Sequence, residues 1–142
     1  MKEYVLVIEL TTVAIHSRLV STSGTIVHSS TRPLETLLPS PERPYIVELD
    51  PARLWSSIRS TVTDCVKRAK GGKILAITTA GQRFTTAMID DEGGTSVLCP
   101  NMDARGAEVE DLAIGTLGEK AYQITGLHPS FLFSFDRLRW FV

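Results

Sequence analysis

Long apolar runs, cysteine and an excess of charge of one sign are all scarce in this 142-residue sequence. No apolar run approaches the roughly 20 residues that a membrane-spanning helix needs. The apolar stretch at the start is short, ends at the acidic Glu9 and is followed by no small-residue cleavage site, so it does not resemble a secretory signal. The net charge of -1 gives no reason to expect nucleic acid or an anionic membrane as a partner. We therefore expect a cytoplasmic protein.

The scarcity of cysteine argues against structures that depend on several cysteines. Cys65 and Cys99 are too few and too far apart to predict a disulfide scaffold or a zinc site. The hydrophobic fraction of 43% and the charged fraction of 22% are instead typical of a globular protein. The length is sufficient for one domain with a buried core.

Strand patterns fill the first third of the sequence. Tyr4 to Leu10 is a nearly continuous apolar run, which indicates a strand covered on both faces. Val13 to Ser21 and Thr25 to Thr31 carry strong β-formers and are separated by a turn. We expect these segments to form a three-stranded antiparallel meander.

A loop and a helix follow. The loop contains Pro33, Pro39, Pro41 and Pro44. Asp50 and Pro51 are the signature of a helix start, with the carboxylate capping the first amides. One buried stripe is predicted from the helical spacing of Leu54, Trp55, Ile58, Val62, Cys65, Val66 and Ala69. Gly71-Gly72 ends the helix.

The remaining segments alternate between the two types of structure. Lys73 to Thr79 is predicted as a second buried strand. Two more strands are predicted at Phe84 to Asp90 and Ser96 to Cys99. Asp103 is expected to cap a helix that runs to about Thr116, and Phe135 to Val142 reads as the start of another.

A meander, a crossover helix and a further strand predict an α/β domain with a mixed sheet. This order of elements opens the ribonuclease H-like, or actin-like ATPase, architecture. A fold alone says little about function, so function has to be inferred from the motifs.

Five segments carry such motifs: Val7 to Thr12, Val47 to Pro51 with Trp55, Ile77 to Thr86, Asp103 to Arg105, and Ile124 to Leu127 with Arg137 to Trp140. In this order and spacing they resemble the amino-terminal part of the FGGY carbohydrate kinases, the family of glycerol, xylulose and ribulose kinases. The resemblance covers about Tyr4 to Trp140. It implies transfer of a phosphoryl group from ATP, with Mg2+, to a hydroxyl of a sugar or polyol.

On the phosphate and magnesium side, the resemblance points to Glu9, Thr11 and Thr12. Family members usually have an aspartate at the position of Glu9 and a glycine at that of Thr11. A carboxylate at the end of a buried strand suits a metal-associated role. The alternative is that Glu9 simply faces solvent at a strand end.

For substrate binding, the resemblance points to Gln82, Arg83 and Asp103. Gln82 and Arg83 follow a strand at a turn and offer several donors for hydroxyl groups; the alternative is a surface turn with an exposed arginine. Asp103 and Arg105 either line the sugar cleft or hold one another at a helix start, where Asp103 is the cap. Phe84 and Leu132 stand where glycerol kinases have a glutamate and tend to have a tyrosine, which favours a larger or different sugar, or an altered site.

Family kinases are considerably longer, with two actin-like domains. We therefore expect this chain, 1–142, to be an incomplete N-terminal domain. The catalytic base and the ATP-binding domain are expected beyond Val142. Two hypotheses stay open: a fragment of a carbohydrate kinase that is inactive by itself and binds neither ATP nor Mg2+, or a stand-alone, non-catalytic relic or binding module with the same fold. The exposed sheet edge is expected to favour self-association.

Overall fold

The chain forms two compact units in the computed structural model, which describes residues 1–37 and 41–142, without the side chains of 112–114 and 116–117. Unit 1 comprises Met1–Glu35 and Asp50–Gln82, and unit 2 comprises Thr36–Leu49 and Arg83–Val142. Pro39 of the predicted proline-rich loop lies outside the described residues. In this described part, no helix combines the length and apolar character needed to cross a membrane.

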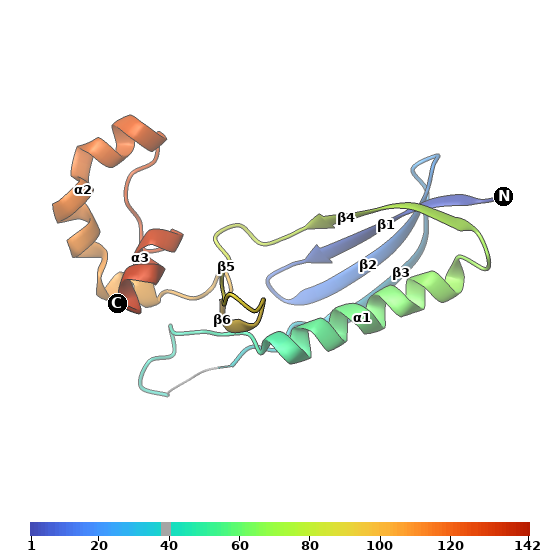
Figure 1. The fold of residues 1–142 in the computed structure, drawn as a ribbon, viewed down its shortest axis with the longest axis horizontal. Helices are drawn as coiled ribbons and strands as arrows, with labels where there is room; N and C mark the ends of the chain where they lie inside the picture. The colour runs from blue at the N-terminus through green and yellow to red at the C-terminus, as the bar shows by residue number, and fades with distance from the viewer. Residues whose placement is uncertain (38–40) are drawn as a thin grey trace. The chain divides into compact units, whose positions relative to one another are not determined.

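Unit 1 is built on a four-stranded mixed sheet in the order β3-β2-β1-β4. Its strands are β1 (Glu3–Leu10), β2 (Ala14–Ser21), β3 (Ile26–Pro33) and β4 (Lys73–Ala80). The first three pair antiparallel, which confirms the predicted meander, and β4 pairs parallel with β1 (Figure 1). The predicted α/β fold with a mixed sheet is therefore observed.

Helix α1 (Pro51–Arg68) connects the meander to β4. Asp50 caps it as predicted, since its Oδ1 accepts hydrogen bonds from the amides of Ala52 and Arg53 at 2.9 and 3.0 Å. The helix packs on one face of β1, β2 and β3. The core of the unit lies between them and consists of Tyr4, Leu6, Leu19, Cys65 and Ala69.

Two predictions about burial in unit 1 are wrong. Trp55 and Val66, expected in the buried stripe of α1, are 61% and 48% exposed. The polar Thr61 lies at the interface instead, fully buried and hydrogen-bonded to Ser17 at 2.8 Å. The apolar positions of α1 span a wider arc than the sheet covers, so the contact with the sheet decides which of them are buried.

Strand β4, predicted to be buried, is exposed along most of its length. Leu75 and Ile77 are 46% and 64% exposed. The strand lies at the edge of the described sheet, whereas α1 packs mainly over β2 and β3. The apolar sequence of β4 therefore predicted the strand correctly. It did not indicate whether other elements pack on the two faces of that strand.

Unit 2 contains a hairpin and short helices. Strands β5 (Thr86–Ile89) and β6 (Thr95–Cys99) pair antiparallel, and η1 (Arg105–Glu108), α2 (Glu110–Thr125) and α3 (Ser134–Trp140) follow. The strand predicted from Phe84 begins only at Thr86, because Phe84 has a left-handed φ of 63°. Helix α2 is kinked at Gly118 and ends at Gly126, whose φ is 71°.

Candidate functional site

The turn between β1 and β2 holds two of the three residues expected on the phosphate side. Thr11 closes this turn: its Oγ1 donates to the carbonyl oxygen of Ala14 at 2.9 Å and accepts from the Ala14 amide at 3.0 Å. Thr12 follows it and is partly buried. The Thr11 hydroxyl thus fixes the shape of the turn, because both hydrogen bonds join it to the backbone of Ala14 at the other end of that turn.

Glu9 precedes this turn in β1 and forms an ion pair with Arg18 of β2, with 2.5 Å between Oε2 and Nη1. The hydrogen bond from Arg18 is the main reason that the pKa of Glu9 is lowered, so its carboxylate is ionised at neutral pH. The Glu9 side chain is 34% exposed. Among the described residues no three His, Cys, Asp or Glu side chains gather as metal ligands.

Gln82 reaches the same turn from β4. Its Nε2 donates to the carbonyl oxygen of Thr11 at 2.5 Å. The contact follows from topology: β1 and β4 are parallel neighbours, with Glu9 opposite Ala80, so their carboxyl ends meet at one edge of the sheet. The structure thus brings Glu9, Thr11 and Gln82 together within unit 1.

Arg83 and Phe84 belong to unit 2. Arg83 is exposed, and its guanidinium carbon lies 5.7 Å from the centre of the Phe84 ring. That ring packs at 5.5 Å against Phe133, ahead of α3. Phe84 holds a backbone conformation that an aromatic residue rarely adopts, and this kind of strain is concentrated at functional sites.

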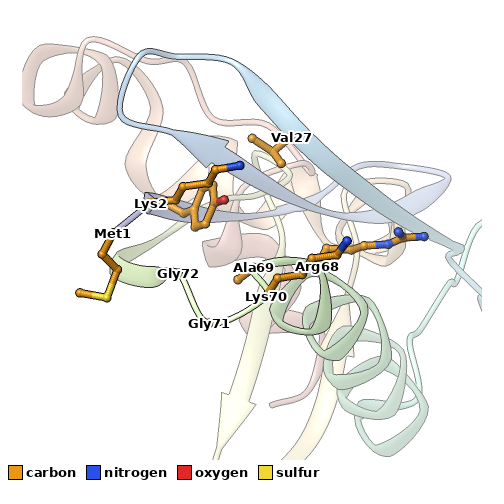
Figure 2. Close-up of a pocket in the computed structure, with 9 residues that line it drawn as sticks. Met1, Lys2, Val27, Arg68, Ala69, Lys70, Gly71 and Gly72 are labelled. Carbon is orange, nitrogen blue, oxygen red and sulfur yellow. The ribbon is translucent and has the colours of Figure 1, made fainter.

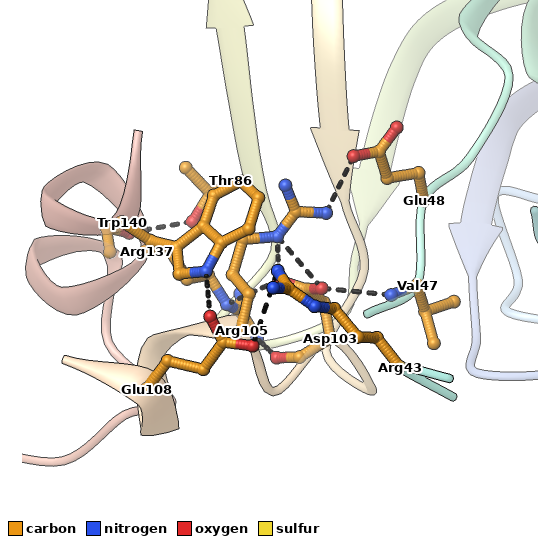
Figure 3. Close-up of polar contacts among 10 residues, drawn as sticks. Arg43, Val47, Glu48, Thr86, Asp103, Arg105, Glu108, Arg137 and Trp140 are labelled. Carbon is orange, nitrogen blue, oxygen red and sulfur yellow. Dashed lines mark hydrogen bonds and ion pairs between the residues drawn. The ribbon is translucent and has the colours of Figure 1, made fainter. Parts of the chain in front are cut away.

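Asp103, the third candidate for substrate binding, is completely buried in unit 2. Its carboxylate accepts hydrogen bonds from the Val47 amide at 3.0 Å and from Nε of Arg105 at 2.9 and 3.0 Å (Figure 3). The prediction that Asp103 caps a helix is wrong, because the 3-10 helix begins after Ala104 and has no side-chain cap. Its carboxylate ties two segments together instead.

Arg105 lies at the centre of this buried cluster. Its Nη2 donates to Glu48 at 2.7 Å, and its guanidinium carbon lies 4.9 Å from the Trp140 ring and 4.8 Å from the Phe141 ring. Burial acts to lower the pKa of Arg105, but the hydrogen bonds that it donates to Glu48 and Asp103 outweigh this effect and the pKa is raised. Arg105 is therefore a permanently charged link between these segments.

Two further residues complete the cluster. Arg137 is fully buried and donates from Nη2 to the carbonyl oxygen of Asp103 at 2.7 Å, and burial lowers the pKa of its guanidinium. Glu108 accepts hydrogen bonds from the Tyr45 hydroxyl and from Nε1 of Trp140, both at 2.7 Å, and the bond from Tyr45 is the main cause of its lowered pKa.

The pairing of Asp103 with Arg105 was one of the alternatives expected from the sequence, but the rest of the cluster was not. Glu48, Arg105, Arg137 and Trp140 all lie in the recognised motifs, but those motifs were not expected to meet. The sequence signal for a buried ion pair was Asp103 and Arg105, an acidic and a basic residue two positions apart, because buried charges need partners. The partners of that pair come from positions 48 and 137, which sequence spacing alone does not relate.

Comparison with known proteins gives a consistent result. The sequence model of the FGGY family of carbohydrate kinases, N-terminal domain, matches residues 4–142. A glycerol kinase of Paraburkholderia phytofirmans is 32% identical over 143 residues, which are 97% of this chain and 28% of that protein. The chain thus spans little more than a quarter of the length of this curated relative.

Two solved structures share the fold. A xylulose kinase from Rhodospirillum rubrum has a TM-score of 0.84 at 23% identity, over 96% of this chain and 28% of that one. The glycerol kinase of Plasmodium falciparum with ADP has a TM-score of 0.83 at 20% identity, over 98% of this chain and 28% of that one. At these identities the likeness concerns the fold, which agrees with the predicted actin-like ATPase architecture.

Proposed function

The chain belongs to the FGGY family of carbohydrate kinases, and we propose that it is the front part of an ATP-dependent kinase that phosphorylates a hydroxyl of a sugar or polyol. The single observation that carries this proposal is the hydrogen bond from Gln82 to the carbonyl of Thr11. It joins the turn assigned to the phosphates with the turn assigned to the substrate. Phosphoryl transfer depends on holding these two reactants together.

Each candidate residue has a role in this proposal. The β1–β2 turn, shaped by Thr11, faces the ATP phosphates, with Thr12 beside it. Gln82 and Arg83 donate hydrogen bonds to the hydroxyls of the substrate. Phe84 adds an apolar surface, which favours a larger sugar over glycerol. Asp103 serves the substrate indirectly, since its buried carboxylate fixes the segment that follows β6.

ATP and Mg2+ are the proposed cofactors of the whole kinase. In support, one solved structure with this fold is described as a glycerol kinase with ADP. Glu9 is proposed to serve the magnesium side, and its Oε2 is held by the ion pair with Arg18. The catalytic base and the ATP-binding domain are proposed to lie in the remainder of the kinase, so the isolated chain is expected to show no turnover.

The test uses the native protein from its source cell. It is captured with an antibody to this chain, its intact mass is measured, and ATP-dependent phosphorylation of glycerol, xylulose and gluconate is assayed. We expect a mass several times the 15.6 kDa of this chain and activity on at least one substrate. Gln82→Ala in that protein should lower kcat/KM. A native mass near 15.6 kDa with no activity would overturn the proposal.

A second candidate function, a non-catalytic binding module, is favoured by the ion pair of Glu9 with Arg18. In this alternative the arginine has taken the place of the metal at the phosphate side. Titration of the chain with pentitols, ketopentoses and glycerol should then shift the Gln82 and Arg83 amides in NMR spectra. Titration with Mg-ATP should leave Glu9 and Thr11 unchanged. Spectra that do not move across the sugar panel would contradict this alternative.

A further inference from the structure

A hollow of about 520 Å3 lies in unit 1 at the end of the sheet where β1 begins, away from the candidate phosphate turn. Its lining comes from the start of the chain, one residue of β3 and the segment after α1: Met1, Lys2, Tyr4, Val27 and residues 68–72. Lys2 lies on the strand side of the hollow, and Arg68 and Lys70 lie at the end of the helix (Figure 2).

Strand geometry explains why Lys2 faces the hollow. Side chains alternate along a strand, so Lys2 is on the same face as Tyr4, which packs against α1. Glu3 lies on the opposite face, in register with Lys73 of β4. Glu3 lines a second, adjoining hollow, which shares Met1, Lys2, Tyr4 and Val27 with the first but does not include the end of α1.

The charges around this hollow have one sign. Lys2, Arg68 and Lys70 form no ion pair with the described residues, and the lining contains no acidic side chain. Cations collected around a concave surface raise the local concentration of anions. Arg68 and Lys70 also suit the negative end of the α1 dipole, but that effect does not account for Lys2, which lies outside the helix.

The floor of the hollow supplies a neutral donor. Tyr4 is 5% exposed and lines the hollow, and its hydroxyl has no hydrogen-bond partner within residues 1–37 and 41–142. The Tyr4 hydroxyl oxygen is not among the buried side-chain atoms without a partner, so it is accessible from the hollow and can donate to a ligand there. Val27, Met1 and Ala69 add apolar surface beside it.

We propose that this hollow binds a small organic phosphate, with Lys2, Arg68 and Lys70 around the phosphate and the Tyr4 hydroxyl donating a hydrogen bond to it. Three cations and one neutral donor match a dianion with several acceptor oxygens. The apolar floor accommodates the carbon part of the ligand. The site is separate from the candidate phosphate turn and does not depend on the proposed kinase function.

The test is an NMR titration of the 142-residue chain with inorganic phosphate, glycerol 3-phosphate and, as the uncharged control, glycerol. We expect saturable shifts of the Gly71 and Gly72 amides with both phosphates and none there with glycerol. Tighter binding of glycerol 3-phosphate than of inorganic phosphate assigns the carbon part to the apolar floor. Shifts at Gln82 are counted separately, because they report on the candidate substrate site.

Two variants and a control test whether the phosphate binds at a defined site or is attracted only by the general positive charge of the helix end. Lys70→Gln and Arg68→Gln should each weaken binding of glycerol 3-phosphate about fivefold, the loss expected for one exposed ion pair. The matched control is Lys67→Gln, which removes the same charge from the same helix end outside the hollow. Shifts that do not saturate, or an equal loss in Lys67→Gln, would overturn the proposal.

Discussion

At the scale of single residues, the buried charges of unit 2 are the most consequential feature. Asp103, Arg105 and Arg137 are all at most 1% exposed, and each contacts at least one of the others. Charges removed from water are costly unless they are paired, so the loss of one partner affects the others. Their role is to hold segments from three motifs in one arrangement, with Glu48 and Trp140 at its margin.

Arg105→Met should destabilise unit 2 by about 3 kcal/mol, because it leaves the buried Asp103 carboxylate with the more distant Arg137 as its one charged partner among the described residues. The control is Arg53→Met, whose ion pair with Glu35 is 66% exposed on both sides and should cost less than about 1 kcal/mol. Urea unfolding followed by far-UV circular dichroism, which reports on both units, measures both losses of stability. Equal losses in the two variants would contradict the structural role of the cluster.

Glu108 makes this cluster sensitive to acid. Its pKa in the folded chain is below the ordinary value of 4.5, so its contribution to stability is complete above pH 4.5 and is lost as the pH falls through the lower folded value. Glu108→Gln should therefore lower the free energy of unfolding at neutral pH, and the difference from the unmodified chain should shrink below pH 4.5. Urea titrations at several pH values test this, and a difference that is independent of pH would contradict it.

At the scale of elements, the contact between the end of α1 and the start of β1 leaves little space. Gly72 follows the helix, and a Cβ there would lie 2.5 Å from Cε2 of Tyr4 and 2.9 Å from the carbonyl oxygen of Lys2. Tyr4 is part of the core, so its ring cannot move away freely. The glycine is required by this close approach.

Gly72→Ala should thus destabilise unit 1 by about 1–3 kcal/mol, the range for overpacking a core. Gly81→Ala is the matched control, since a Cβ at Gly81 meets nothing within 4 Å. Thermal unfolding of both variants by circular dichroism compares them. If the two melting temperatures agree, Tyr4 is not held as tightly as the structure indicates.

At the scale of the whole molecule, the described chain leaves β4 exposed. This strand is an edge of the sheet and carries exposed apolar residues on it, of which Ile77 is 64% exposed. Edges and patches of this kind promote association with another chain or with further parts of the same protein. The chain also spans only 28% of its curated relatives.

We expect the isolated chain to self-associate through β4 as its concentration rises. Ile77→Lys should reduce this association, because it places a charge on the exposed strand. Ile124→Lys is the control, since Ile124 is 74% exposed but lies in α2 of unit 2. Sedimentation velocity over a range of concentrations measures the effect. Equal behaviour of both variants would exclude β4 as the contact surface.

The sequence by itself determined the type and order of the elements. The apolar periods fixed β1 to β3, and Asp50, Pro51 and Gly71 marked the ends of α1. The order of the motifs also determined the family, which the match over residues 4–142 confirms. These features are local in sequence, because side-chain periodicity, helix capping and turn formation each depend on a few neighbouring residues.

Only the tertiary structure decided which residues meet and which face solvent. The bond from Gln82 to Thr11 requires β1 and β4 to be parallel neighbours, and the cluster around Asp103 joins positions more than fifty residues apart. Ile77 is exposed because α1 covers only part of one sheet face, and Trp55 is exposed because the sheet covers only part of the apolar arc of α1. Burial and charge pairing are properties of packing between distant segments, and the local pattern of a chain does not contain them.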